Sequence, residues 1–371
     1  MFASTGILPD LGGDLTDQIN HCVDVDLGNT GIIASTSPKT GKKTSKYALL
    51  RQVQTVLDGS GYAVEGCQKC IGGGVQVMRS GDDAYFDGII TCKSIWTCPV
   101  CAQRINSQRL DDLKDALGSG YKTVMVTATL RHDQSDRLRD LLRSLKDAVR
   151  RVKSGRWWGD YKDRHGVIAS VSSYEITHGV FGWHPHIHML LFLDRDRPDV
   201  DVMWSDLVSR YVYLVDRGGG YASRHHAVDV TRTGSDAGQY LVKHVSVDPG
   251  LASEMSSTDT KDGRWSGSKS FWDLVFLSRY FADAVDLVKE YADATYRLKS
   301  FVWSRGAKDI LGVKDQKDRD GDRDDPLPVA DITRPVWTVI RTHALQDVVL
   351  SLAVLGDDQL KDFLGGLSGG S

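Results

Sequence analysis

The apolar positions of this chain follow a two-residue period in three stretches, which predicts β-strands. In residues 121–130, threonines and a methionine alternate with valines, and residues 166–177 and 182–193 are further apolar runs of strand length. The turn between the last two runs is short, which predicts a β-hairpin. Because Pro185 cannot donate a ladder hydrogen bond, we expect it to interrupt the third strand.

Other apolar residues recur at helical spacing. Helices are expected over residues 47–57, 102–117, 138–152, 200–215 and 270–298. The polar face of the third helix is strongly basic and consists of Arg137, Arg139, Arg143, Lys146, Arg150, Arg151 and Lys153. Such a face contacts either solvent or DNA phosphates, and the pattern leaves both open.

The composition indicates a soluble protein with more than one domain. The chain has 371 residues, of which 41% are hydrophobic and 26% are charged. No apolar run is long enough to span a bilayer and the N-terminus lacks a signal pattern, so we expect a cytoplasmic protein without a membrane partner. The net charge is −3, yet residues 41–313 carry 38 basic and 33 acidic residues, which permits DNA binding without indicating it.

Two histidines on the third predicted strand are candidate metal ligands. His186 and His188 are two residues apart, so their imidazoles project from one face and can hold a divalent cation. In the hairpin, Glu175 lies near their level, and its carboxylate completes a set suited to Mg²⁺ or Mn²⁺. His184 is interpreted as the approach to this site. The alternatives are a structural zinc site or a hydrogen-bonded polar pair, with Glu175 as an exposed cross-strand partner.

Six cysteines occur in the chain, and five of them lie within residues 67–101. Two CxxC pairs, each presented by a turn, supply the donors of a tetrahedral zinc site. The predicted ligands are Cys67, Cys70, Cys98 and Cys101, with Cys92 as a spare or a substitute. Four thiolates leave no open coordination position, so the predicted role of Zn²⁺ is structural. Redox chemistry of the CxxC pairs is the alternative.

A helix predicted over residues 235–245 brings three reactive side chains together. Asp236, Tyr240 and Lys243 are spaced at i−4, i and i+3, so they share one helix face. An acid, a phenol and an amine can act as base, nucleophile and charge stabiliser. On spacing alone, an amphipathic helix with a half-buried tyrosine explains the same pattern.

Together these motifs resemble the replication initiator (Rep) proteins of bacterial rolling-circle plasmids, which are members of the HUH endonuclease superfamily. The resemblance covers about residues 60–310 and rests on four segments. They are Thr127-Ala128-Thr129-Leu130-Arg131-His132, Glu175-Ile176-Thr177 with Gly182-Trp183-His184-Pro185-His186-Ile187-His188, Tyr240-Leu241-Val242-Lys243, and Trp96-Thr97-Cys98-Pro99-Val100-Cys101. The second segment is the most specific, and the third gains weight from its order and distance in the chain.

The resemblance implies an α+β fold with an HUH-type central antiparallel sheet flanked by helices, an N-terminal zinc-binding segment and a helical C-terminal region. The expected parts are a disordered tail (1–40), a zinc-binding segment (41–112), an HUH nuclease domain (113–250), a helical region (251–313), and a charged linker with a C-terminal tail (314–371).

The resemblance also implies the chemistry. Tyr240 is the expected nucleophile for nicking one strand of a plasmid double-strand origin, single-stranded at the nick. The products are a 5′-phosphotyrosine and a 3′-OH primer for host DNA polymerase, with a host helicase as a further partner. The histidine pair and Glu175 are expected to hold Mg²⁺ or Mn²⁺. Asp236 occupies the position at which related initiators often carry a water-activating Glu, and Lys243 is expected to stabilise the tyrosinate or the phosphate.

Two other functions use overlapping features. An HUH relaxase or transposase performs the same chemistry in another process, and nicking of supercoiled origin DNA separates it from replication initiation. A non-catalytic zinc-containing DNA-binding regulator predicts zinc at the cysteines, no divalent metal at the histidine pair and no strand cleavage.

Overall fold

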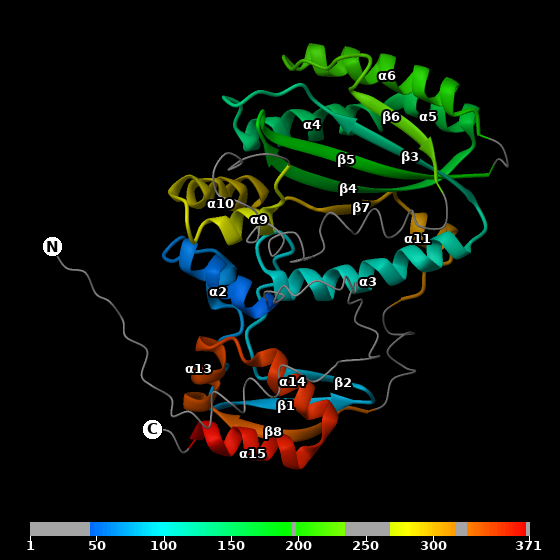
Figure 1. Ribbon diagram of the computed structural model, residues 1–371. Helices are drawn as coiled ribbons and strands as arrows, with labels where there is room; N and C mark the ends of the chain where they lie inside the picture. Colours follow the sequence, from blue (N-terminus) through cyan, green and yellow to red (C-terminus); the bar gives the residue numbers. More distant parts are fainter. Residues whose placement is uncertain (1–44, 195–197, 234–267, 316–324, 369–371) are drawn as a thin grey trace, which may run out of the picture. The chain divides into compact units, whose positions relative to one another are not determined.

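The protein forms two units in this computed structural model (Figure 1). The structure describes residues 45–194, 198–233, 268–315 and 325–368. Of these, the large unit contains residues 45–67 and 91–315, and the small unit contains residues 68–90 and 325–368.

The large unit is built on a five-stranded antiparallel sheet with strand order β6-β3-β5-β4-β7. Its strands are β3 (Lys122–Thr129), β4 (Val167–Gly179), β5 (Gly182–Leu193), β6 (Val228–Arg232) and β7 (Phe301–Trp303). The predicted hairpin is formed by β4 and β5, which pair along their whole length. The predicted α+β fold is thus confirmed, whereas the HUH type of the sheet stays a prediction.

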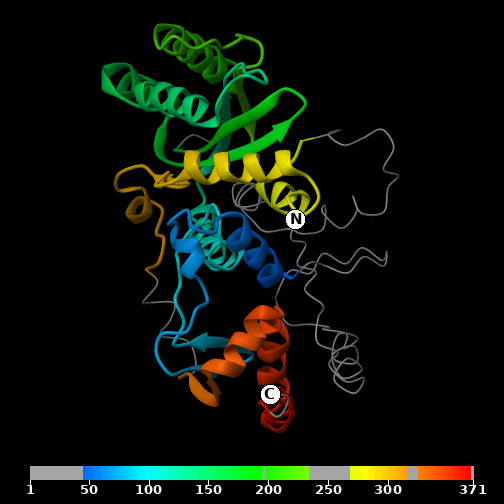
Figure 2. The same ribbon diagram turned by 90° about the vertical axis from the view of Figure 1, so that its left-hand side faces the viewer.

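Helices cover both faces of this sheet (Figures 1 and 2). They are α3 (Pro99–Gly118), α4 (Leu138–Val152), α5 (Gly155–His165), α6 (Val200–Arg217) and α11 (Ala307–Ile310), and the unit also holds α2 (Lys46–Val56), the 3₁₀ helix η1 (Ala63–Gly66), α9 (Phe271–Leu277) and α10 (Ala282–Thr295). Ile187 of β5 shares a core cluster with leucines of α4 and α6, whereas Leu190 and Phe192 share another with α3 and α11. Since alternate residues share a face, His186 and His188 lie on the α3 side of the sheet.

β5 continues through Pro185, so the prediction of an interruption there was wrong. Pro185 lies opposite Ile176 of β4. The neighbour on the other side, β3, ends opposite His186. Pro185 therefore lies where β5 has a single neighbouring strand, and a missing N–H is tolerated there as it is on an edge strand.

The small unit has a three-stranded antiparallel sheet with strand order β2-β1-β8. Its elements are β1 (Gly74–Ser80), β2 (Asp83–Asp87), β8 (Leu327–Thr333), α13 (Arg334–Thr342), α14 (Gln346–Leu355) and α15 (Asp357–Ser368). Trp337 is buried at its centre, where the ring centroid lies 4.7 Å from that of Phe86 and Nε1 donates to the carbonyl of Gln68 at 2.9 Å.

These two units differ from the predicted division of the chain. Residues 68–90 are predicted to lie within the zinc-binding segment, and residues 314–371 to form a linker and tail. In the structure, strands from both stretches pair with each other and enclose one core. The apolar residues of 327–368 pack against strands far earlier in the chain, and a local pattern does not reveal such a partner.

No single helix in the described part of the chain is long and apolar enough to cross a membrane. The helices α13 and α14 pass that test only as a pair, and they bend by 113° at the break between them.

Candidate metal centres

Three of the predicted ligands converge on the α3 side of the large sheet. Glu175 of β4 lies directly opposite His186 of β5. The Nε2 atom of His188 is 2.8 Å from Oε2 of Glu175, and the Nδ1 atom of His186 is 3.6 Å from the same oxygen. One ligand atom from each residue lies within 4.8 Å of the others. The structure therefore brings together the two histidines and the carboxylate that were predicted from their spacing.

His188 is oriented through both of its ring nitrogens. Its side chain is only 2% exposed. Thr127 lies opposite it on β3, and Oγ1 of Thr127 is 3.0 Å from Nδ1 of His188. Without a metal ion, Nε2 donates to the carboxylate of Glu175, and Nδ1 accepts from this hydroxyl. With a metal ion between His188 and Glu175, Nδ1 donates to the hydroxyl and the lone pair of Nε2 faces the ion. This is the orientation in which a second hydrogen bond prepares a histidine for a metal ion.

The donor set fits a divalent cation. The Nδ1 atom of His186 is buried and makes no hydrogen bond within the described residues. Adjacent ligands of an octahedral Mg²⁺, each about 2.1 Å from the ion, lie about 3 Å apart. The separations of 2.8 and 3.6 Å from the carboxylate oxygen of Glu175 lie on either side of this value. A carboxylate and two imidazoles also leave coordination positions for water and phosphate.

A pocket of about 440 Å³ opens beside this set, at the end of the sheet where β4 turns into β5. His184 lines it, and the ring centroid of His184 is 4.0 Å from that of His186. Burial, together with His186 and His132, lowers the pKa of His184 to about 4, against the opposite effect of Glu175. The imidazole of His184 is therefore neutral at pH 7, and it separates the pocket from the ligand set.

Tyr240, Asp236 and Lys243 lie outside the described residues, so their predicted roles stay predictions. The last described strand before them is β6. It pairs with β3, which in turn pairs with β5, and Thr127 of β3 lies opposite both Asp229 of β6 and His188 of β5.

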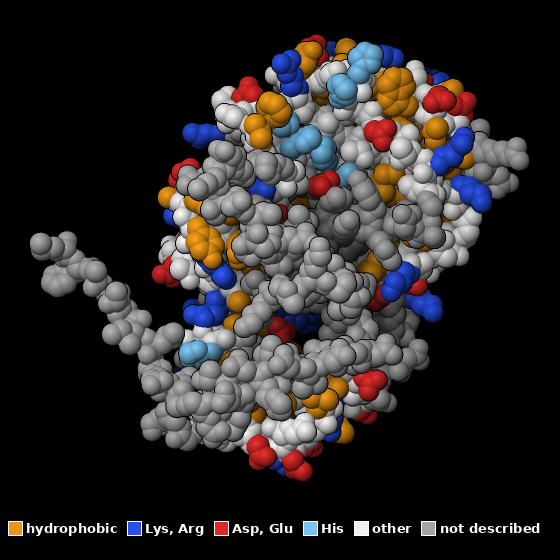
Figure 3. Space-filling model, viewed as in Figure 1, with side chains coloured by type: hydrophobic (Ala, Val, Ile, Leu, Met, Phe, Trp, Pro, Cys, Tyr) orange, Lys and Arg blue, Asp and Glu red, His pale blue; other side chains and the backbone are white. Residues whose placement is uncertain are grey.

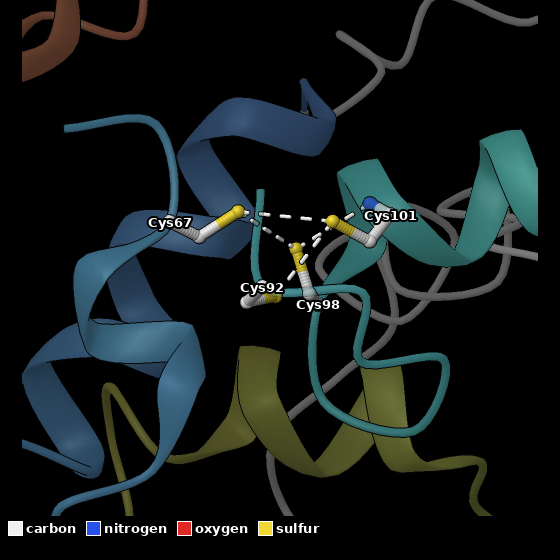
Figure 4. A group of neighbouring side chains, drawn as sticks. All are labelled: Cys67, Cys92, Cys98 and Cys101. Atoms are coloured by element: carbon white, nitrogen blue, oxygen red, sulfur yellow. Dashed lines mark hydrogen bonds between the residues drawn. The ribbon is translucent and has the colours of Figure 1, made fainter. Parts of the chain in front are cut away.

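Four cysteines of the large unit form a second cluster (Figure 4). The Sγ atom of Cys67 is 3.6 Å from that of Cys98 and 3.8 Å from that of Cys101. The Sγ atom of Cys92 is 3.7 Å from that of Cys101. Zinc–sulfur bonds of about 2.3 Å in a tetrahedron put the sulfur atoms about 3.8 Å apart. The four thiols are not bonded to one another, and their spacing fits a tetrahedral zinc ion.

Hydrogen bonds from the backbone hold two of these thiols. Cys98 is the N-cap of α3, and its Sγ accepts a hydrogen bond from the N–H of Cys101 at 3.4 Å. The Sγ of Cys92 accepts from the N–H of Ser94 at 3.5 Å. Hydrogen bonds among the thiols lower the pKa of Cys101 and raise the pKa of Cys92 and Cys98. Zinc binds cysteine as the thiolate, and the charge of the ion itself favours loss of the proton from a coordinating thiol.

The cluster differs from the predicted ligand set in one member, because Cys92 takes the place of Cys70. Cys70 belongs to the small unit, where its Sγ donates to two glycine carbonyls at 3.3 and 3.1 Å. The chain turns away directly after Cys67, since Gln68 has a φ of +65° and its N–H donates to the carbonyl of Ile90 at 2.7 Å. The CxxC spacing predicted Cys70 as a ligand. However, the strand β1 (Gly74–Ser80) follows Cys70, and both belong to the small unit.

Comparisons with known proteins match the middle of the chain. Residues 86–200 match the family model described as Replication protein. Protein rep of Streptomyces lividans is 31% identical over a 137-residue alignment, and the match covers 29% of this chain and 30% of that protein. The neomycin resistance protein of Streptomyces cyanogenus is 30% identical over a 135-residue alignment, and the match covers 29% of this chain and 31% of that protein. The chain thus spans less than a third of these relatives, and no solved structure matches it.

Proposed function

We propose that this chain initiates plasmid replication by nicking and rejoining one DNA strand, because residues 86–200 match the family model described as Replication protein. The resemblance to plasmid Rep proteins, first inferred from the sequence motifs, is thereby confirmed. The matched stretch contains Glu175, His186 and His188, and the proposal depends above all on the convergence of their ligand atoms within 4.8 Å. Two imidazoles and a carboxylate on rigid strands suit the cation that assists phosphodiester cleavage.

In the proposed reaction, Tyr240 is the nucleophile. The phenol loses its proton as its oxygen bonds to phosphorus, the bond from phosphorus to the 3′ oxygen breaks, and the leaving oxygen gains a proton, so the net charge does not change. The products are a 5′-phosphotyrosine and a free 3′-OH, which primes synthesis by a host polymerase after a helicase opens the duplex. The reverse reaction joins the strands, since the phosphotyrosine conserves the broken bond. Asp236 activates the water molecule that acts in the terminating cleavage. Lys243 stabilises the tyrosinate or the phosphate.

The residues of β3, β4 and β5 prepare the site for the scissile phosphate. Glu175, His186 and His188 would hold Mg²⁺ or Mn²⁺, which offsets negative charge on the non-bridging phosphate oxygens. Thr127 fixes the ring of His188 through Nδ1, at 3.0 Å. Because these side chains project from paired strands rather than loops, their geometry is set before DNA binds.

The cysteine cluster has a structural role in this proposal. Four thiolates around Zn²⁺ leave no position for substrate. Trp96 lies in the loop between Cys92 and Cys98. Its Nε1 donates to the carbonyl of Leu298 at 2.8 Å, which connects this loop to the segment after α10. Zinc would therefore fix the start of α3, the helix that packs on the same sheet face as the histidine pair.

Incubation of the full chain with single-stranded oligonucleotides from the plasmid origin and Mn²⁺ tests the proposal. We expect a covalent protein–DNA species on a denaturing gel, and we expect a chelator to abolish it. If neither this species nor a cut strand forms with any divalent cation, the nicking function is refuted.

The nucleophile is tested separately with Tyr240→Phe, which should remove the covalent species and leave DNA binding intact. Tyr280→Phe is the control, since Tyr280 is 66% exposed and lies far from the histidine strand in sequence. An adduct that persists in Tyr240→Phe would rule out this tyrosine. Extension of the 3′ end after nicking of supercoiled origin DNA distinguishes initiation from the reaction of a relaxase or transposase.

A further inference from the structure

The pocket beside the ligand set is formed by three connections of the large unit. They are the loop after β3, the turn between β4 and β5, and the loop between α6 and β6. Hydrogen bonds join these connections to one another. Gln134 donates from Nε2 to the carbonyl of Val180 at 2.6 Å, and the N–H of Arg131 donates to the carbonyl of Tyr221 at 3.0 Å. The shape of the pocket is therefore set by the fold.

The lining of this pocket combines aromatic and cationic groups. Phe181 is 72% exposed and Tyr221 is 58% exposed, although both are large apolar side chains. The guanidinium carbon of Arg131 lies 5.2 Å from the ring centroid of Tyr221. His226 and Ser223 add groups that can donate or accept hydrogen bonds, and no carboxylate lines the pocket in the described part of the chain. Figure 3 shows histidine and apolar side chains close together on this face of the large unit.

We infer that this pocket binds one unpaired base of the DNA strand, that of a nucleotide next to the phosphate at Glu175, His186 and His188. The inference rests on the proposed function. His184 lines the pocket, and its ring centroid is 4.0 Å from that of His186, so the pocket begins one side chain away from the ligand set. A volume of about 440 Å³ lies in the range of small-ligand pockets.

The side chains that line the pocket can contact both the base and the phosphate of a nucleotide. The exposed rings of Phe181 and Tyr221 provide flat apolar surfaces on which any base can stack. Arg131 provides the positive charge that a neighbouring phosphate requires. A base that lies against these rings is out of the duplex stack, and its hydrogen-bonding edge is then free to contact His226 and Ser223. The pocket thus selects a single strand and adds base preference at one position.

The test measures binding without cleavage. A short thymidine oligonucleotide with one central 2-aminopurine is titrated with the zinc-loaded full chain, with no Mg²⁺ or Mn²⁺ added. Stacking quenches the fluorescence of this base, so we expect quenching with the unmodified protein. Phe181→Ala and Tyr221→Ala should each reduce the quenching and weaken binding by about 5- to 150-fold, the range for one stacked base. Tyr221→Phe keeps the aromatic ring and should retain both the quenching and the binding affinity.

The matched control is Tyr280→Ala, which removes a ring of similar exposure from another part of the large unit and should change nothing. The inference is overturned if both pocket variants quench and bind like the unmodified protein, or if a duplex with the same base paired binds equally well. Glu175→Gln separates the two proposals, because it should abolish the covalent adduct with Mn²⁺ and leave the quenching intact. Quenching without an adduct in the unmodified protein would refute nicking alone.

Discussion

Replacing Thr127 with valine tests whether the hydroxyl beside His188 supports metal binding. Valine keeps the branched shape on β3 but removes Oγ1, which lies 3.0 Å from Nδ1 of His188. Loss of such an orienting hydrogen bond weakens metal affinity by about 10- to 100-fold. At about 1.4 kcal/mol for each factor of ten, the binding free energy should fall by roughly 1.4–2.8 kcal/mol.

The same substitution should also lower folding stability in zinc-loaded protein without Mg²⁺ or Mn²⁺. His188 is 2% exposed, so water cannot easily replace the hydroxyl of Thr127 as the partner of Nδ1. A buried polar atom that loses its hydrogen-bond partner costs about 1–3 kcal/mol. Thermal unfolding without Mg²⁺ or Mn²⁺ therefore gives a second, independent measure of this contact.

Calorimetric titration with Mn²⁺ of protein that keeps its zinc but carries no Mg²⁺ or Mn²⁺ measures the effect on affinity without any DNA. Thr123→Val is the matched control, because Thr123 lies on the same face of the same strand and its Oγ1 is 2.7 Å from that of Thr233 instead. We expect the Kd for Mn²⁺ to rise in Thr127→Val and to stay unchanged in Thr123→Val. Equal affinities in the two variants would refute the view that Thr127 orients a metal ligand.

Three further changes test other parts of the structure. Cys92→Ser should release the zinc measured in the purified protein and Cys70→Ser should retain it, whereas the opposite result would favour the ligand set predicted from the CxxC spacing. Gly182→Ala should lower the melting temperature more than Gly155→Ala does. The free energy of unfolding should be lower in Gly182→Ala than in Gly155→Ala by about 1–3 kcal/mol. Both glycines have positive φ, +84° and +71°, but only a Cβ at Gly182 would meet a backbone oxygen, at 2.7 Å; equal losses would contradict this contact. Burial lowers the pKa of Lys153 to about 8, so between that pH and its ordinary pKa of 10.5 the unfolded chain binds more protons and stability should rise with pH. Melting curves at about pH 7.5 and about pH 10 should show this rise, and an identical rise in Lys153→Met would exclude Lys153 as its source.

The metal-ligand set could be predicted because it depends on local rules. The two-residue period of a strand puts His186 and His188 on one face, and a short hairpin connection brings Glu175 to their level. Both rules act within one hairpin, and the observed pairing of Glu175 with His186 follows them. The position of Tyr240 depends on a segment beyond the described residues, so its relation to this set is still a prediction.

The structure differs from the sequence-based predictions where a side chain contacts a segment that is distant in the sequence. The sequence assigns Lys153 to the basic outer face of a helix, but its Nζ donates to the hydroxyls of Ser170 and Ser172 on β4 at 3.1 and 3.3 Å. The position after the last helical turn directs this side chain toward the sheet. Likewise, the fourth cysteine of the cluster depends on where the chain leaves the large unit, and that depends on the pairing of β1 with β8.

The cysteine cluster has a consequence for how the chain tolerates change. The stretch between Cys67 and Cys92 leaves the large unit and returns to it, and both of its ends carry a sulfur atom of the same cluster. The cluster holds the two ends of this loop together. The conformational entropy lost on closing a loop grows only slowly with its length. Insertions in the turn between β1 and β2 should therefore leave the strand pairing of the large unit intact, whereas insertions or deletions within β1 would disrupt the sheet of the small unit.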